Sequence, residues 1–214
     1  MPIWRDKRPT ITSEEYAGFE GAYDWFNTRL FAGKLPPCLI TLQRKARSRG
    51  NFATDRFGHR LEVQASTDEL ALNPDTFVDR SDKDILSTLV HEMCHCWQRH
   101  FGTPSRTGYH NKEWAVEMVG VGLMPSDTGA PGGKQTGQHV SHYIMAGGTY
   151  DQAAAALLAT GFRLNWQSLT LERQESKARS KTKFTCPSCG QNAWAKPDAA
   201  LICGECEEPM EGEQ

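Results

Sequence analysis

The chain has 214 residues, 38% of them hydrophobic, and a formal net charge of -2 at pH 7. This length and composition predict one main domain with a smaller appendage, and no stretch is apolar over the length that a bilayer span needs. The charged N-terminus is not followed by an apolar run, so no secretory signal is expected, and the expected location is cytoplasmic, with association with the nucleoid as an option.

The first 80 residues are predicted to form a helix followed by short strands. Aromatic residues recur at helical spacing in residues 13–31, with Thr12 or Ser13 as the cap. The expected strands are residues 39–43, 51–57, 60–66 and 69–72, with Gly58 in a hairpin turn. A basic cluster after the first strand consists of Arg44, Lys45, Arg47 and Arg49.

A long helix after Ser81 is predicted to carry His91 and His95. Residues four apart project from one face of a helix, so both imidazoles can share a metal ion while Glu92 lies beside it. This is the HExxH arrangement of zinc hydrolases. The alternative is a core helix whose histidines bond backbone carbonyls. Glu92 is the only acid in residues 85–96, and the cost of burying an unpaired carboxylate favours the metal site.

A catalytic zinc ion usually takes three protein ligands and leaves one position for water. His110 is the best candidate for the third ligand, because it follows a loop and opens a second amphipathic helix, residues 111–119. The side chains expected to pack inward there are Trp114, Val116 and Met118. Zinc would lower the pKa of its bound water to about 7, and Glu92 would move the proton to the leaving amine as general base.

These residues resemble the SprT-like (Spartan-like) zinc metalloproteases, a family with members that cleave proteins crosslinked to DNA. The resemblance rests on the HExxH segment, on His110 and on the pair Glu113-Trp114 that follows it. Upstream it includes residues 26–31, 33–37 and 70–74, so it spans about the first 125 residues. It implies that His91, His95 and His110 are zinc ligands, that Glu92 is the general base, and that the substrates are proteins attached to DNA.

Cysteines and histidines elsewhere in this region are given plain interpretations. Cys38, Cys94 and Cys96 are expected to be small core residues rather than nucleophiles. His59 and His100 are expected on the surface. No function is assigned to any of the five.

Glycine-rich residues 126–149, here called the arm, predict a loop laid over the domain, and residues 153–160 predict a short helix. His139, His142 and Tyr143 lie in the arm. A histidine or tyrosine near the metal could stabilise the oxyanion, which makes the arm a candidate lid. The alternative is that both histidines are ordinary surface residues.

The C-terminal segment contains two C-x-x-C pairs, typical of a tetrahedral zinc site. The expected ligands are Cys186, Cys189, Cys203 and Cys206. Four sulfur ligands leave no open position, so this zinc ion is predicted to be structural, and Gly190 and Gly204 are expected in the tight turns. Two disulfides are the alternative, disfavoured by the lack of a secretory signal.

Basic residues before this ribbon predict contacts with nucleic-acid phosphates, although a solvated linker is the equal alternative. The candidate DNA-binding residues are Lys177, Arg179, Lys181 and Lys183. Phe184 and Trp194 could stack on bases or form the small core of the ribbon.

The sequence thus predicts an α+β, zincin-like protease domain with a small antiparallel-type sheet. The predicted parts are a protease domain (1–125), the arm with a short helix as a candidate lid (126–167), a basic linker (168–184) and a four-cysteine zinc ribbon (185–214). Two zinc ions per chain, a protein substrate, DNA as a partner and no membrane contact are expected; the oligomeric state is left open. The alternative function is a non-proteolytic, zinc-binding nucleic-acid or transcription-associated regulator.

Overall fold

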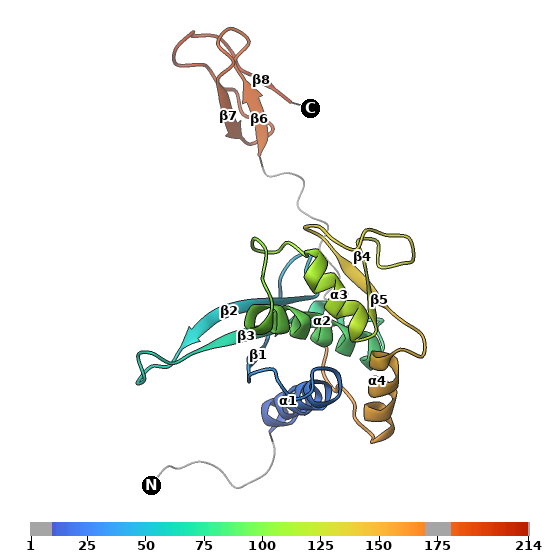
Figure 1. Ribbon diagram of the computed structural model, residues 1–214. Helices are drawn as coiled ribbons and strands as arrows, with labels where there is room; N and C mark the ends of the chain where they lie inside the picture. Colours follow the sequence, from blue (N-terminus) through green and yellow to red (C-terminus); the bar gives the residue numbers. More distant parts are fainter. Residues whose placement is uncertain (1–9, 170–180, 214) are drawn as a thin grey trace. The chain divides into compact units, whose positions relative to one another are not determined.

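The computed structural model describes residues 10–169 and 181–213. The chain divides into two compact units at the Leu169–Thr170 boundary, and Figure 1 shows the elements of each. Within the described ranges, four α-helices and two small sheets make up the first unit and one small sheet the second, which confirms the mixed α+β class. No helix in this part of the chain has the length and apolar character required to cross a membrane.

Helix α1 (Ile11–Leu30) begins two residues before its predicted start. The cap is Thr10, whose side chain accepts the backbone N–H of Ser13, while the Ser13 hydroxyl accepts the backbone N–H of Thr10. This capping box satisfies N–H groups that the start of a helix leaves without partners. The aromatic side chains that α1 buries are Phe19, Tyr23 and Phe26.

The first sheet contains β1 (Leu39–Leu42), β2 (Gly50–Gly58) and β3 (Ser66–Leu72) in the order β1-β3-β2. β3 pairs antiparallel with β2 but parallel with β1. The predicted antiparallel-type sheet is therefore wrong for one of its two strand pairs. A parallel neighbour requires a crossover connection, and here strand β2 lies between β1 and β3 in the sequence.

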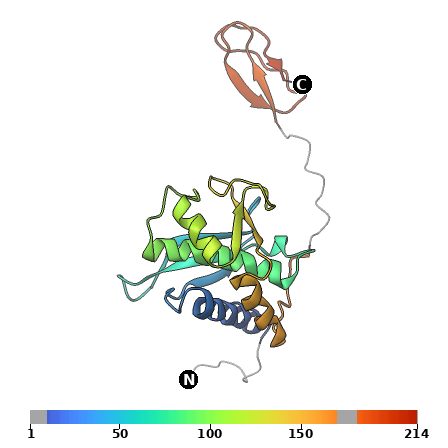
Figure 2. The ribbon, with the colours of Figure 1, turned by 45° about the vertical axis from the view of Figure 1, so that its right-hand side comes forward.

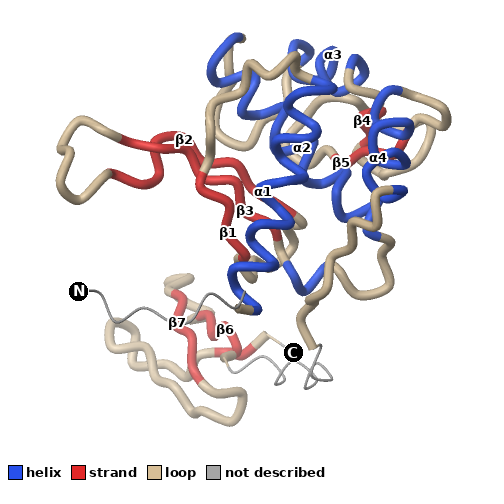
Figure 3. Tube along the Cα trace, turned by 90° about the horizontal axis from the view of Figure 1, so that it is seen from below, coloured by secondary structure: helices blue, strands red, loops and turns tan. Residues whose placement is uncertain are grey.

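The predicted strand at residues 60–66 is wrong, because residues 59–65 form the tip of the hairpin between β2 and β3. This hairpin projects from the body of the first unit (Figures 1 and 3). Leu61 and Val63 alternate with polar residues as in a strand, yet their exposed fractions are 88% and 96%. Alternation specifies a strand only where one face has a core to pack against, and the tip has none.

Helix α2 (Asp82–Phe101) lies in the middle of the first unit, between α1 and α3 (Figures 1 and 2). It has the predicted cap, since the Ser81 hydroxyl accepts the backbone N–H of Asp84. Ile85 to Cys94 are all buried, because α2 packs against β2, β3 and the other helices. A helix buried on most sides gives its polar residues a surrounding of low polarity.

Helix α3 (Lys112–Gly120) begins after its cap Asn111, whose side chain accepts the backbone N–H of Trp114. Trp114 and Met118 are fully buried, as predicted. The inward orientation predicted for Val116 is wrong, since 63% of it is exposed. Residues two apart on a helix point in nearly opposite directions, so Val116 cannot share the face of Trp114.

The arm contains strand β5 (Ser141–Ile144), which pairs antiparallel with β4 (Leu123–Ser126). Helix α4 (Thr149–Ala159) follows. Buried Tyr150 stacks on Phe26 of α1, with 5.5 Å between ring centroids, and its hydroxyl donates to the backbone carbonyl of α2 residue Lys83. These contacts fasten α4, and with it the end of the arm, to the core.

The second unit is a small antiparallel sheet of β6 (Thr182–Thr185), β7 (Asn192–Ala195) and β8 (Glu211–Gly212), in the order β7-β6-β8. Phe184 is 5% exposed and Trp194 is 61% exposed. Of the two aromatic residues, Phe184 therefore forms the small core and Trp194 faces outward.

Candidate metal centres

Three imidazoles converge in the first unit. His91 and His95 lie one turn apart on α2, and His110 directly precedes the cap of α3. The distances between ring centroids are 5.3 Å for His91 and His95, 5.4 Å for His91 and His110, and 4.9 Å for His95 and His110. One nitrogen from each ring lies within 4.8 Å of the other two. The three rings can therefore bind one metal ion.

The indole of Trp114 packs against all three imidazoles. Its ring centroid lies 4.9 Å from that of His91, 5.1 Å from that of His95 and 4.3 Å from that of His110. The His95 ring is nearly parallel to the indole, at 17°, and the other two meet it edge-on. Trp114 is fully buried, so these contacts restrict the rotamers of the three rings.

The arm fixes the ring of His110. The Nδ1 atom of His110 lies 3.2 Å from the backbone oxygen of Gly137, and the backbones of the two residues exchange two further hydrogen bonds of 2.9 and 3.0 Å. A carbonyl oxygen can only accept, so Nδ1 carries the proton and donates. The Nε2 atom of His110 is then the nitrogen with a free lone pair for a metal.

His142 of β5 contacts His91, which the sequence does not reveal. Its Nδ1 lies 3.1 Å from Nδ1 of His91, and its Nε2 lies 2.8 Å from the hydroxyl of Ser87. The interpretation of His142 as an ordinary surface residue is wrong, whereas His139 is exposed. Tyr143 lines a cavity of about 330 Å³ next to His142. The one sequence signal was the strand-forming run that follows His142.

Burial lowers the pKa of all three converging histidines. The pKa of His95 falls to about 3, that of His91 falls well below its usual value, and that of His110 is also lowered. In each case loss of hydration is the largest cause, and the neighbouring histidines or polar groups add to it or offset it. All three rings are neutral at pH 7, the form that binds metals, and three neutral imidazoles suit zinc.

Glu92 is buried on the side of α2 that faces β2. Burial raises its pKa to about 8, while the charge of Lys45 and the backbone N–H of Phe52 act in the opposite direction. A Cβ atom at Gly50 would lie 2.7 Å from Oε1 of Glu92 and 3.0 Å from Cγ2 of Thr88. Gly50 is therefore required for this close approach. Glu92 is beside the histidine group but contributes no atom to it.

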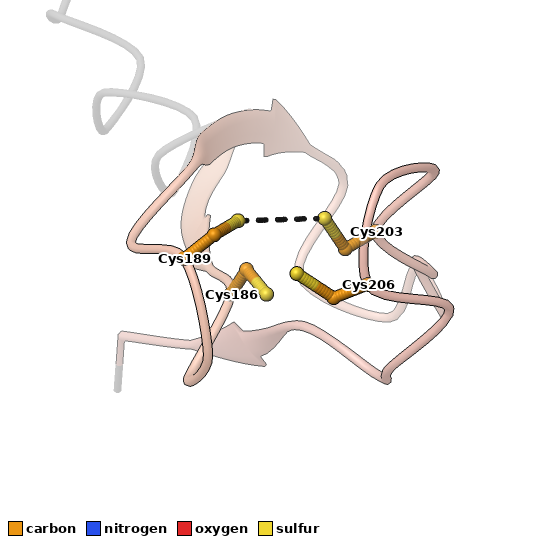
Figure 4. Close-up of side chains that lie close together, drawn as sticks. All are labelled: Cys186, Cys189, Cys203 and Cys206. Atoms are coloured by element: carbon orange, nitrogen blue, oxygen red, sulfur yellow. Dashed lines mark hydrogen bonds between the residues drawn. The ribbon is translucent and has the colours of Figure 1, made fainter.

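The second unit brings its four cysteines together. The sulfur atoms of Cys186, Cys189, Cys203 and Cys206 point toward one another (Figure 4) and lie within 4.8 Å. The Sγ atoms of Cys189 and Cys203 are 3.7 Å apart. Sulfurs bound at about 2.3 Å to one tetrahedral zinc ion would lie about 3.8 Å apart. This cluster fits the predicted zinc ribbon.

The two C-x-x-C turns share one backbone conformation. The residue four positions after the first cysteine is left-handed in both: Gly190 has φ +71° and Glu207 has φ +56°. Gly204, expected in this role, has no positive φ. Backbone N–H groups of Cys206 and Glu205 bond the sulfur of Cys203 and lower its pKa to about 7, which favours the thiolate that binds metals.

A third cluster contains Cys38, Cys96 and Asp68. The two Sγ atoms are 3.7 Å apart. Both oxygens of Asp68 already accept or share hydrogen bonds, from the backbone of Asp55 and from the ring of His100. Because the carboxylate is engaged, no metal is assigned here. Cys94 and Cys96 are fully buried, in agreement with a core role, and His100 is a partner of Asp68.

The candidate DNA-binding residues are only partly described. Lys177 and Arg179 lie outside the described residues. Lys181 is exposed, and the amino group of Lys183 lies 2.8 Å from a carboxylate oxygen of Glu213. The charge of Lys183 is therefore partly neutralised by the acidic end of the chain.

The sequence was compared with known protein families and proteins. The sequence profile of the SprT-like family matches residues 19–134, more than half of the chain. The chain belongs to the SprT-like family. The match includes all three converging histidines, Glu92 and the first part of the arm.

A second similarity is to a Salmonella typhimurium protein described as an uncharacterized protein in the mucB 3' region. The two are 52% identical over 46 residues, which is 22% of this chain and 62% of that protein. The similar segment thus spans less than two thirds of that relative. SprT-like membership suggests a metalloprotease-like function, and the histidine and cysteine groups are candidate metal-binding sites.

Proposed function

We propose that this SprT-like protein is a zinc-dependent endopeptidase that uses a water molecule as nucleophile. The observation that carries the proposal is the convergence of His91, His95 and His110 as neutral rings, with a buried Glu92 next in sequence to the first. A site that held zinc only for stability would not require a buried carboxylate at that position, because burying it is costly.

The three histidines and Glu92 have separate roles in this proposal. His91, His95 and His110 would hold zinc, which supplies Lewis-acid chemistry that activates water and polarises a peptide carbonyl. Glu92 accepts the proton of the attacking water on its carboxylate. Burial raises the pKa of Glu92 to about 8 in the metal-free chain, and the positive charge of a zinc ion would lower it, so that the carboxylate is available to accept the proton and pass it to the leaving amine.

The four cysteines would hold a second, structural zinc ion. The four sulfurs would fill every position of a tetrahedral zinc ion, so no position would remain for substrate or water. Zinc stoichiometry tests both sites together: two ions per chain are expected, one lost in His110→Ala and the other in Cys186→Ser.

We further propose that the substrates are proteins held on DNA. Lys183 and Trp194 are directly opposite each other on β6 and β7, and residues paired in this way share one face of a sheet. An exposed indole opposite a lysine is suited to a base and its phosphate, and the phosphate would take the place of Glu213 on the amino group of Lys183. DNA affinity should fall with rising salt, and more steeply in the wild type than in a chain with Lys181 and Lys183 neutralised.

The proposed hydrolysis is tested with Glu92→Gln. Casein cleavage, measured with and without DNA, should disappear in this variant while the zinc content stays at that of the wild type. Glu62→Gln, an exposed change at the hairpin tip, is the matched control and should cleave normally. Full cleavage by Glu92→Gln would remove Glu92 from the mechanism. DNA binding by a wild-type chain that cleaves nothing would favour the alternative, a non-proteolytic regulator.

A further inference from the structure

A chain of three hydrogen bonds leads away from Nδ1 of His91. Nδ1 of His91 lies 3.1 Å from Nδ1 of His142, Nε2 of His142 lies 2.8 Å from Oγ of Ser87, and that Oγ lies 2.7 Å from the backbone oxygen of Asp84. Ser87 and Asp84 belong to α2, as His91 does, whereas His142 belongs to the arm. The arm thus places one side chain between two positions of the metal-binding helix.

The donor and acceptor of each hydrogen bond can be assigned by starting from the backbone oxygen of Asp84, at the end of the chain of bonds. A backbone oxygen only accepts, so the Ser87 hydroxyl donates to Asp84 and its lone pairs are left for His142. Nε2 of His142 therefore carries the proton and donates to Ser87. In a neutral imidazole the other nitrogen is then an acceptor, so Nδ1 of His142 accepts the Nδ1 proton of His91.

We propose that His142 is a positioning residue for the metal: by accepting the Nδ1 proton of His91, it holds that ring in the tautomer and orientation that present Nε2 to the ion. This inference rests on the proposed zinc site and extends it. His110 is held in the same way, because its Nδ1 donates to the carbonyl of Gly137, also in the arm. Hydrogen bonds to the outer nitrogen of a ligand histidine raise its basicity and fix its orientation.

His95 differs from His91 and His110. Its ring stacks on Trp114 and makes no hydrogen bond within the described residues. Two of the three ligands thus depend on the arm and one depends on packing alone. Loss of the arm contact should therefore weaken metal binding without removing any ligand.

Three variants separate this role from simple packing. His142→Phe keeps a ring of similar volume and removes the acceptor. His142→Asn places an amide oxygen near the position of Nδ1 and restores it. Ser87→Ala leaves His142 in place but removes the partner that selects its tautomer. His59→Phe, at the hairpin tip, is the control for introducing phenylalanine.

The first readout is zinc affinity, from competition with a chromophoric chelator, at the site that His110→Ala abolishes. We expect a 10- to 100-fold loss in His142→Phe, a smaller loss in Ser87→Ala, recovery to within about threefold in His142→Asn, and no change in His59→Phe. Wild-type affinity in a folded His142→Phe chain would overturn the proposal. A wild-type chain that binds no zinc at this site would overturn the proposed function instead.

The second readout needs neither metal nor activity. Nitrogen-15 NMR of the histidine rings in the metal-free wild type should show His91 protonated on Nδ1 and His142 protonated on Nε2. If His142→Phe does not fold, this measurement and Ser87→Ala decide the matter. Protonation of His91 on Nε2 in the metal-free wild type would contradict the assignment.

Discussion

The indole of Trp114 lies nearly parallel to the imidazole of His95, at 17° and with 5.1 Å between ring centroids. Trp114→Ala should lower the free energy of unfolding by about 3–5 kcal/mol and weaken zinc binding at the histidine site, because the cavity frees the rotamers of all three rings. Urea unfolding and zinc titration measure the two effects. Phe19→Ala, an equally buried aromatic of α1, should cost similar stability and leave the zinc affinity of the folded chain unchanged. Equal zinc affinities in the two variants would show that zinc binding does not depend on the packing of Trp114 against the three imidazoles.

Gly50→Ala should disable Glu92 without removing zinc. The added Cβ would lie 2.7 Å from Oε1 of Glu92, so the carboxylate must move. We expect peptidase activity to fall at least tenfold and stability to fall by about 1–3 kcal/mol, as is usual for overpacking. Gly58→Ala, at the far end of β2, meets nothing within 4 Å and should behave as the wild type. Activity retained in Gly50→Ala would mean that Glu92 does not act from this position.

The metal-free chain should be most stable near neutral pH. Burial lowers the pKa of His95 and of His142 to about 3, so the unfolded chain takes up protons below about pH 6.5 and stability falls as the pH falls. Burial raises the pKa of Glu92 to about 8. Between its ordinary pKa of about 4.5 and pH 8, the unfolded chain has lost a proton that the folded chain keeps, so this contribution to stability falls as the pH rises.

Each such proton changes the free energy of unfolding by up to about 1.4 kcal/mol per pH unit. Urea unfolding in the presence of a chelator, followed by helical circular dichroism, reports on the first unit, which contains all the described helices. Glu92→Gln should flatten the alkaline side of the profile and steepen the rise between about pH 4.5 and 6.5, because the falling contribution of Glu92 is removed from both. A profile that rises continuously from pH 5 to pH 8 in the wild type would contradict the burial of Glu92.

Glu207→Gly should tighten zinc binding by the ribbon. Glu207 has φ +56°, and a left-handed conformation costs a residue with a side chain about 1–2 kcal/mol. Glycine at this position removes that cost and adds some chain entropy, for a net gain of about 0.5–1 kcal/mol, or a two- to fivefold higher zinc affinity. Gly190→Ala, at the equivalent position of the first turn, should lower the affinity by a similar factor. Lower affinity in Glu207→Gly would overturn this account.

The elements that local patterns specify could be predicted from the sequence. Ser81 caps α2 because the hydroxyl and the N–H it accepts are three residues apart, and His91 and His95 share a face because they are one turn apart. The parallel pairing of β1 with β3 could not be predicted, since it depends on contacts across about 30 residues. Leu61 and Val63 misled the strand prediction because alternation says nothing about what lies beneath a hairpin tip.

The candidate site shows the same division. The position of His110 could be inferred from the need for a third ligand, but the contact of His142 with His91 spans 51 positions and follows no periodic pattern. The conformation of Glu207 was equally hidden, because glycine is the residue that usually signals a positive φ.

The arm also sets the smallest fragment that can be expected to work. A chain cut at residue 134, where the family match ends, would retain every proposed ligand of the histidine site and the proposed base, yet it would lack Gly137 and His142. Such a truncated chain should bind zinc loosely and show little of the proposed peptidase activity even if it is well folded. A fragment made to study the histidine site should therefore extend through α4, whose Tyr150 fastens the arm to the rest.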